Sequence, residues 1–306
     1  MLKRIVNEAT FELEITTTGP LLVRSGQATV SGPDMTPVLT FRNNEWQVFI
    51  PGSSLKGVIR SHSEKIVRTL RDGLCCNPFA KVNEPDSSCG VQLGNQKPAP
   101  TPERAYALSC PVCRLFGSLE FIGRISIGDA YLKDGIPAPR KELRDGVGID
   151  RLTGGPKSQA KFTLEAVSSG AVFRSEVLLR NFECWQLSLI LAVVQDMADG
   201  LLRIGGGRSR GFGAVKGAIP VLGLHHLGVP QEQLGGAIWG LGRFLNDGTY
   251  GTSPDDLLRM QPPLNWQRRG IRLHTEVPGD KISELNAIGL PDMVRRLEAW
   301  QLTRRT

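Results

Sequence analysis

The sequence predicts an α+β fold in which strands alternate with two long helices. Residues 10–17 alternate apolar and polar side chains, which is the pattern of a strand with one buried face. The apolar residues of 53–70 and 185–202 recur at helical spacing instead, and strand-like segments lie between and after these two helices. This order of strands, helix, strands, helix and strand is close to the split β-α-β pattern of a ferredoxin-like (RRM-like) fold with two insertions.

Each expected strand is bounded by turn residues. Gly19-Pro20 ends the first one, residues 25–34 have the composition of an exposed loop, and Arg42-Asn43-Asn44-Glu45 suits a hairpin turn. The expected strands are 10–17, 21–23, 38–40, 46–50, 123–132, 161–167, 171–179 and 214–220.

Three regions depart from this regular pattern. Residues 72–113 are rich in Pro, Gly, Ser, Asn and Cys and read as an irregular insertion, and residues 140–165 are polar and basic. In the tail, helices are expected at 231–245 and 280–302, but no role follows from the sequence. We therefore expect one domain over 1–220 that includes both segments, and a C-terminal extension over 221–306.

Composition limits the class of protein. A hydrophobic fraction of 40% in 306 residues is enough for a core. No apolar run reaches the roughly 20 residues that span a bilayer, and residues 1–5 lack a signal-peptide core, so we expect a cytoplasmic protein with no membrane partner. The net charge of +7 favours a polyanionic partner, and six cysteines in such a chain favour a metal over disulfides.

The turn at residues 50–60 carries the signs of a phosphate site. Pro51-Gly52 breaks the strand, and Ser53 and Ser54 are residues that cap helices. The N-terminus of a helix offers unpaired N–H groups to an anion, and Lys56 and Arg60 add cations one turn apart. The plainer alternative is a capped helix with two surface cations.

A glycine loop follows the second long helix, at residues 205–213. Gly205, Gly206 and Gly207 would let the backbone approach a ligand closely, and Arg208 and Arg210 add charge, which suits a sugar-phosphate chain. The loop is not a Walker motif, because no Gly-Lys-Ser/Thr follows it. A simple turn between helix and strand is the alternative.

The cysteines of the insertion predict a structural zinc site. Cys110-Pro-Val-Cys113 has the spacing of a metal-binding knuckle, and Cys75, Cys76 and Cys89 lie upstream in the same segment. Metal binding would replace the packing that this segment lacks. A redox C-x-x-C is the rival, but its thioredoxin-like context is missing. Free buried thiols are the third possibility.

Two further residues bear on that site. His62 could replace one of the cysteine ligands, whereas Cys184 lies far away at the start of a helix and is expected in the core.

Four motifs together resemble the backbone subunits of type III CRISPR effector complexes, which belong to the RAMP superfamily. They are the early loop with Asp34, residues 50–60, Cys110-Pro-Val-Cys-Arg-Leu-Phe-Gly117 and residues 205–213. The resemblance spans roughly residues 10–220. It implies a RAMP domain with a zinc-bearing insertion, and a thumb hairpin that pushes between bases of the guide–target duplex.

The resemblance also assigns residues. It implies that two turns hold the guide RNA between them, and that Ile149 or Leu152 of the hairpin inserts between bases as a wedge. It also implies four zinc ligands, with Cys75 as an alternate. The implied RNA-binding residues are Ser53, Ser54, Lys56, Arg60, Gly205, Gly206, Gly207, Arg208, Arg210, Arg151 and Lys157, and the implied metal ligands are Cys76, Cys89, Cys110 and Cys113.

Asp34 is the implied catalytic residue. Its loop is similar to the family loop whose aspartate is needed to cut target RNA, with one more residue before Pro37 than the family pattern has. Such an aspartate would hold a divalent cation such as Mg2+ or orient a 2′-hydroxyl for attack, leaving a 2′,3′-cyclic phosphate. An aspartate in a Gly-Pro-Asp turn is also commonly structural.

By resemblance, then, the chain lines CRISPR RNA, cuts paired single-stranded target RNA as a metal-dependent endoribonuclease, and assembles with other effector subunits, including copies or paralogues of itself. One rival is a non-catalytic scaffold subunit. Another is a guide-processing endonuclease with His62 as general base. A DNA-binding regulator has little support, because no helix-turn-helix pattern is present.

Overall fold

The core of the protein is one antiparallel sheet. The computed structural model describes residues 3–24, 32–81, 84 and 87–300. The sheet has the strand order β15-β16-β12-β1-β10-β6, and in addition β11 pairs with β1 and β7 with β10. Its strands are β1 (Asn7–Thr17), β6 (Ile125–Ile127), β7 (Tyr131–Leu132), β10 (Val172–Arg180), β11 (Val215–Ala218), β12 (Val221–Leu227), β15 (Gln267–Arg269) and β16 (Arg272–Pro278).

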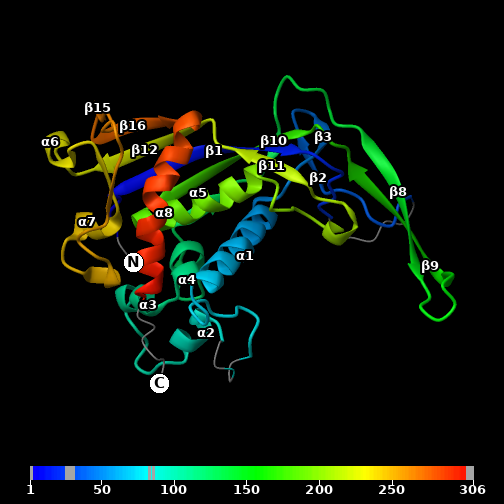
Figure 1. Cartoon of the computed structure of the whole chain (residues 1–306), viewed down its shortest axis with the longest axis horizontal. Coiled ribbons are helices and arrows are strands. Elements are labelled where there is room, and N and C mark those ends of the chain that lie inside the picture. The colour runs from blue at the N-terminus through cyan, green and yellow to red at the C-terminus, as the bar shows by residue number, and fades with distance from the viewer. Residues whose placement is uncertain (1–2, 25–31, 82–83, 85–86, 301–306) are drawn as a thin grey trace.

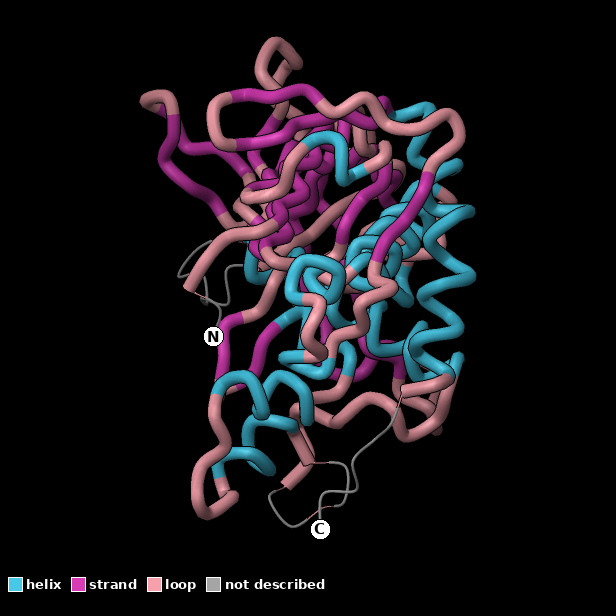
Figure 2. The backbone as a smooth tube through the Cα atoms, turned by 90° about the vertical axis from the view of Figure 1, so that its left-hand side faces the viewer, coloured by secondary structure: helices cyan, strands magenta, loops and turns pink. Residues whose placement is uncertain are grey.

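Three long helices cover one face of this sheet: α1 (Gly52–Leu70), α5 (Cys184–Ala198) and α8 (Ile282–Glu298) (Figures 1 and 2). In β1 every second residue, including Leu13 and Ile15, is fully buried against them. Helix α5 is apolar on nearly all sides because it lies between the sheet and α8. Gly289 allows the close approach of α8, since a Cβ there would lie 2.2 Å from Oγ of Ser188.

The remaining elements are short. In the part of the chain that the structure describes, four two-stranded sheets lie outside the main sheet, and the β8–β9 hairpin projects away from the body (Figure 1). These small sheets are β2 (Leu39–Arg42) with β3 (Glu45–Val48), β4 (Gly117–Ser118) with β5 (Phe121–Ile122), β8 (Lys141–Ile149) with β9 (Pro156–Val167), and β13 (Ala237–Trp239) with β14 (Leu257–Arg259). The short helices are α2 (Cys89–Gly94), α3 (Pro102–Leu108), α4 (Pro111–Phe116), α6 (Gln231–Leu234), α7 (Leu241–Leu245), and the 3-10 turns η1 (Arg208–Arg210), η2 (Thr249–Gly251) and η3 (Gly279–Lys281).

The elements with strong periodicity are confirmed. The strand expected at 10–17 is β1, and the helices expected at 53–70, 185–202 and 280–302 are α1, α5 and α8. The basic segment 140–165 forms the β8–β9 hairpin. The expected hairpin turn at Arg42-Asn43-Asn44-Glu45 joins β2 to β3, with both asparagines at positive φ.

Three expected elements were wrong in detail. The strand predicted for 21–23 is not formed, and Leu21 makes only an isolated bridge with Val167. The helix predicted for 231–245 is divided into α6, β13 and α7, because Gly235 and Gly236 adopt positive φ and end the helix there. The strand predicted for 123–132 is interrupted between β6 and β7, where Gly128 packs against the start of α1. Residues 25–31 of the predicted early loop lie outside the described residues.

The chain after residue 220 is continuous with the same sheet. Strand β12 pairs with β1, β16 extends the sheet beyond β12, and α8 packs on α5. The extension therefore adds strands and a helix to the existing layers. Among the described residues, no helix combines the length and apolar character needed to cross a bilayer.

Candidate nucleic-acid interface and metal centre

The first turn of α1 is capped by a residue from another part of the chain. The expected serine cap was wrong, because Ser53 and Ser54 lie inside the helix and Gly52 is its first residue. The Gly52 N–H donates a hydrogen bond of 2.7 Å to Oδ1 of Asp129. Only glycine fits here, since a Cβ would lie 2.5 Å from the carbonyl oxygen of Ile127. One N–H group expected to bind phosphate is thus already satisfied.

A cavity of about 390 Å³ opens beside this turn, lined by Ser53, Lys56, Ser126 and Arg180 among others. Lys56 is half-buried, and burial together with the neighbouring Arg60 lowers the pKa of its ammonium group. A cation in such surroundings favours a nearby anion, which would offset its lost hydration. Lys56 and Ser53 therefore face the same hollow, as the cradle hypothesis requires.

Arg60 lines a second hollow together with Lys56, but its guanidinium is bonded within the protein. Its Nε donates to Oε1 of Glu64 at 3.1 Å, and its Nη2 lies 3.5 Å from Sγ of Cys113. The sequence grouped Arg60 with Lys56 as a phosphate contact, but the guanidinium is directed to the cysteine segment.

The glycine loop packs against the segment that follows β1. Gly206 N–H donates to the carbonyl of Leu22 at 2.8 Å, and a Cβ on Gly205, whose φ is +81°, would lie 2.4 Å from that oxygen. Glycine is thus required by packing within the protein. Arg208 and Arg210 lie on η1 and are exposed to solvent.

Asp34 is exposed and lies beside the base of the β8–β9 hairpin. Its Oδ2 accepts a hydrogen bond of 2.7 Å from the N–H of Thr163. The next residue, Met35, forms a parallel bridge with Leu164. The Asp34 loop therefore runs along the free edge of β9 as a short third strand.

A small apolar cluster joins this loop to the glycine loop. It is separate from the main core and includes residues from both loops and from β9, and Arg210 lies over the ring of Phe162 with its Cζ 5.4 Å from the centroid. The cluster consists of Leu22, Leu164, Ala166 and Phe212, with Met35 and Phe162 packed against it. The structure thus brings Asp34 and the glycine loop together, and the start of α1 lies on the hairpin side of the molecule as well (Figure 1).

The hairpin tip presents cations and the large apolar side chains of Ile149 and Leu152. Arg151 and Lys157 are exposed, and Leu152 is 98% exposed. Oδ1 of Asp150 accepts from the N–H groups of Leu152 and Thr153, which fixes the turn. Ile149, the other predicted wedge, is 56% exposed at the end of β8.

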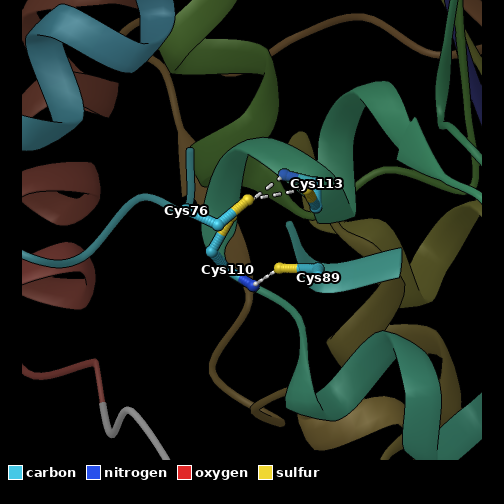
Figure 3. A group of neighbouring side chains, drawn as sticks. All are labelled: Cys76, Cys89, Cys110 and Cys113. Atoms are coloured by element: carbon cyan, nitrogen blue, oxygen red, sulfur yellow. Dashed lines mark hydrogen bonds between the residues drawn. The ribbon is translucent and has the colours of Figure 1, made fainter. Parts of the chain in front are cut away.

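Four cysteines of the insertion form a buried cluster (Figure 3). The sulfur atoms of Cys76, Cys89, Cys110 and Cys113 all lie within 4.8 Å of one another. Sγ of Cys76 is 3.5 Å from Cys113 and 3.7 Å from Cys110. Tetrahedral Zn–S bonds of about 2.3 Å place sulfurs about 3.8 Å apart, so this spacing fits a bound metal ion.

The surrounding backbone also fits such a site. Cys110 N–H donates to Sγ of Cys89 at 3.3 Å, and Cys113 N–H donates to Sγ of Cys110 at 3.4 Å at the start of α4. Hydrogen bonds among these thiols lower the pKa of Cys110 well below its usual range and raise the pKa of Cys76 and of Cys113. These four residues could therefore hold a metal ion, whereas Cys75 lies beside the cluster and donates to the carbonyl of Cys76.

The other two residues considered for this site lie elsewhere. Nε2 of His62 is 2.6 Å from Oδ2 of Asp196, in a partly buried hydrogen bond that links α1 to α5. Cys184 is fully buried at the start of α5, as expected for a core residue.

Sequence reasoning missed Asp129 and Thr163. Asp129 follows a short strand without a recognisable motif, and Thr163 acts through its backbone N–H, which any residue except proline supplies. No local signal identifies either residue, since each partner is distant along the chain.

Residues 14–216, more than half of the chain, match the RAMP superfamily, and the chain belongs to that superfamily. It is similar to the CRISPR system Cms endoribonuclease Csm3 of Methanocaldococcus jannaschii. The two are 28% identical over 227 residues, which cover 70% of this chain and 78% of that protein.

Proposed function

We propose that this chain is a guide-lining backbone subunit of a type III CRISPR effector complex that cleaves target RNA paired with the guide. The relative named as an endoribonuclease of a CRISPR system supports this reading. The observation that carries it is the hydrogen bond from Thr163 N–H to Asp34, which fixes the predicted catalytic acid at the base of the hairpin. An acid held there would act on target RNA that lies along the base of the hairpin.

The expected domain organisation is part of the proposal. The strand order β12-β1-β10-β6, with α1 and α5 on one face, favours a ferredoxin-like RAMP domain over 1–220. Residues 72–113 would be its zinc-binding insertion, 140–165 its thumb and 221–306 its extension. We further propose that the protein works in the cytoplasm with CRISPR RNA, target RNA and other effector subunits, including copies or paralogues of itself.

RNA would be held on two turns. Ser53, Ser54 and Lys56 would bind backbone phosphates at the start of α1, because helix N–H groups and a cation favour phosphate oxygens. The exposed Arg208 and Arg210 of the glycine loop would bind the same strand further along. Arg151 and Lys157 would contact phosphates from the hairpin, and Leu152 would serve as the wedge between bases.

Asp34 would act on the 2′-hydroxyl of the target strand. In this step the carboxylate takes the hydroxyl proton, the 2′-oxygen attacks the adjacent phosphorus, and the bond to the 5′-oxygen breaks as water protonates that oxygen. The products are a 2′,3′-cyclic phosphate and a 5′-hydroxyl. Among the described residues Asp34 joins no cluster of three or more metal ligands, so the expected Mg2+ would take its other ligands from RNA phosphates and water.

The same hydrogen bond also favours a non-catalytic scaffold role, because by accepting from the Thr163 N–H Asp34 attaches its loop to the hairpin. The variant Asp34→Asn distinguishes the catalytic role from the scaffold role, because the amide oxygen still accepts the hydrogen bond but the side chain can no longer take a proton. In the assembled complex we expect cleavage of complementary RNA to slow by about 100-fold or more, with RNA affinity unchanged.

Undiminished cutting by Asp34→Asn would establish the scaffold role. Asp34→Ala, which also loses the hydrogen-bond acceptor, is the companion variant. The difference in RNA affinity between Asp34→Ala and Asp34→Asn would measure how much the hydrogen bond to Thr163 contributes to RNA binding. The guide-processing rival would require His62→Gln to abolish guide maturation, and we expect no such loss because His62 is paired with Asp196.

A further inference from the structure

Helix α1 carries a partly buried stripe of alternating charge. Arg60, Glu64 and Arg68 follow one another at intervals of four residues. Glu64 is only 9% exposed and pairs with both arginines. Its carboxylate lies 3.1 Å from Nε of Arg60 and 3.5 Å from Nη2 of Arg68. Solvated charges do not require such burial, so the stripe serves a contact inside the protein.

That contact is the cysteine cluster. Nη2 of Arg60 lies 3.5 Å from Sγ of Cys113, and Nη1 of Arg60 lies 3.4 Å from the carbonyl oxygen of Gly117. On the next turn but one, Nη2 of Arg68 donates to the carbonyl of Cys76 at 3.1 Å. The two arginines therefore reach both halves of the cluster, the upstream Cys76 and the downstream Cys113.

The charge of the cluster explains why arginines lie there. Four thiolates around one divalent ion carry a net charge of −2, and a buried anion requires hydrogen bonds or opposite charge to replace its hydration. A guanidinium that donates to a ligand sulfur stabilises the thiolate form, and Glu64 keeps both arginines in position.

We propose that Arg60 and Arg68 are the outer-sphere partners of the metal centre, holding its ligands against α1, and that Arg60 is not an RNA contact. The inference rests on the proposed metal site. It places the metal centre and the RNA-binding turn on one rigid helix, since Lys56 lies one turn before Arg60.

The test is metal affinity, measured without RNA. Metal-free protein is titrated with Zn2+ against a chromophoric chelator, and with Co2+, whose thiolate absorption reports the ligand set directly. We expect Arg60→Gln to weaken binding of both ions by about tenfold or more, as the loss of an outer-shell partner does. Arg60→Lys should give an intermediate loss, because it keeps the charge but not the forked geometry. Arg68→Gln should also weaken binding.

The matched control is Lys65→Gln, an exposed cation on the same helix. RNA affinity at saturating Zn2+ is the second readout: we expect Arg60→Gln to match the parent protein, whereas Lys56→Gln should bind RNA less tightly with normal metal affinity.

Unchanged metal affinity in both Arg60 variants, or RNA binding lost in Arg60→Gln at saturating Zn2+, would overturn the inference. A parent protein that takes up neither ion would overturn it together with the metal site. The proposed RNA-binding function is read from Lys56→Gln and is therefore judged independently.

Discussion

Two segments interrupt the strand order of this fold, and they obtain their structure in opposite ways. The insertion around the cysteines consists of loops that join the short helices α2, α3 and the start of α4, yet its cysteine cluster is almost fully buried. The β8–β9 hairpin has two long paired strands, yet most of its side chains are exposed. Regular hydrogen bonding is thus no sign of a packed core, and irregular backbone is no sign of a loose one.

The difference lies in what covers each segment. The insertion is fixed from within, by the sulfur cluster and by Arg60 and Arg68 of α1. The hairpin is fixed only at its base, by the Asp34 loop and the cluster around Phe212. Its tip leaves Leu152 uncovered, and an exposed apolar side chain at the end of a projecting hairpin favours contact with another molecule.

The largest effect should follow removal of the metal. A site loaded at a free metal concentration about a thousand times Kd contributes about 4 kcal/mol to stability, all of which a chelator removes. We therefore expect chelation, or Cys113→Ser, to lower the melting temperature strongly and to expose the insertion to proteolysis. Thermal melts with and without chelator measure this effect.

Cys75→Ser is the matched control for that experiment. Cys75 is buried beside the cluster but outside it, so this variant should keep the full metal-dependent stabilisation. If Cys75→Ser and Cys113→Ser lose the metal-dependent stabilisation equally, the proposed set of four cysteine ligands is wrong. If chelation changes nothing in the parent protein, the insertion is held by packing alone.

An intermediate effect is expected at the base of the hairpin. Phe162 covers Gly146, packs on the small cluster and lies under Arg210. Because the ring is only partly buried, Phe162→Ala should cost about 2 kcal/mol, less than a fully buried phenylalanine. Urea denaturation measures the loss, and limited proteolysis should detect a loosened hairpin. Val147→Ala, on the exposed part of β8, should leave both unchanged; equal losses would mean that the cluster does not anchor the hairpin.

The smallest effect on stability is expected at the hairpin tip. Arg151→Gln with Lys157→Gln should change the free energy of unfolding by less than about 0.5 kcal/mol, because exposed cations contribute little. The same pair should reduce the salt dependence of RNA binding, by roughly 0.7 to 0.9 in log–log slope for each lost phosphate contact. Affinity measured across a salt series gives this slope.

Lys161→Gln serves as the reference for that series, since Lys161 is already paired with Asp145 on the same hairpin. A slope that changes as much in Lys161→Gln as in the tip variant would show that net charge matters rather than position. The tip would then have no specific contact with the RNA backbone.

Local patterns in the sequence correctly predicted the regular elements of this protein and a cluster of cysteines. Apolar spacing fixed α1, α5 and α8, alternation fixed β1, and the cysteine spacing predicted a cluster that could hold metal. These features are local, because helical and strand periods and a C-x-x-C turn depend on residues a few positions apart.

Tertiary structure decided which residues meet. It placed Cys76 rather than Cys75 in the cluster, turned Arg60 from the expected phosphate site toward Cys113, and put Asp34 on Thr163, a residue 129 positions away. It also joined the chain after residue 220 to the central sheet. Such contacts depend on where whole elements pack, and packing is set by the shapes of many buried side chains together, so no local pattern encodes them.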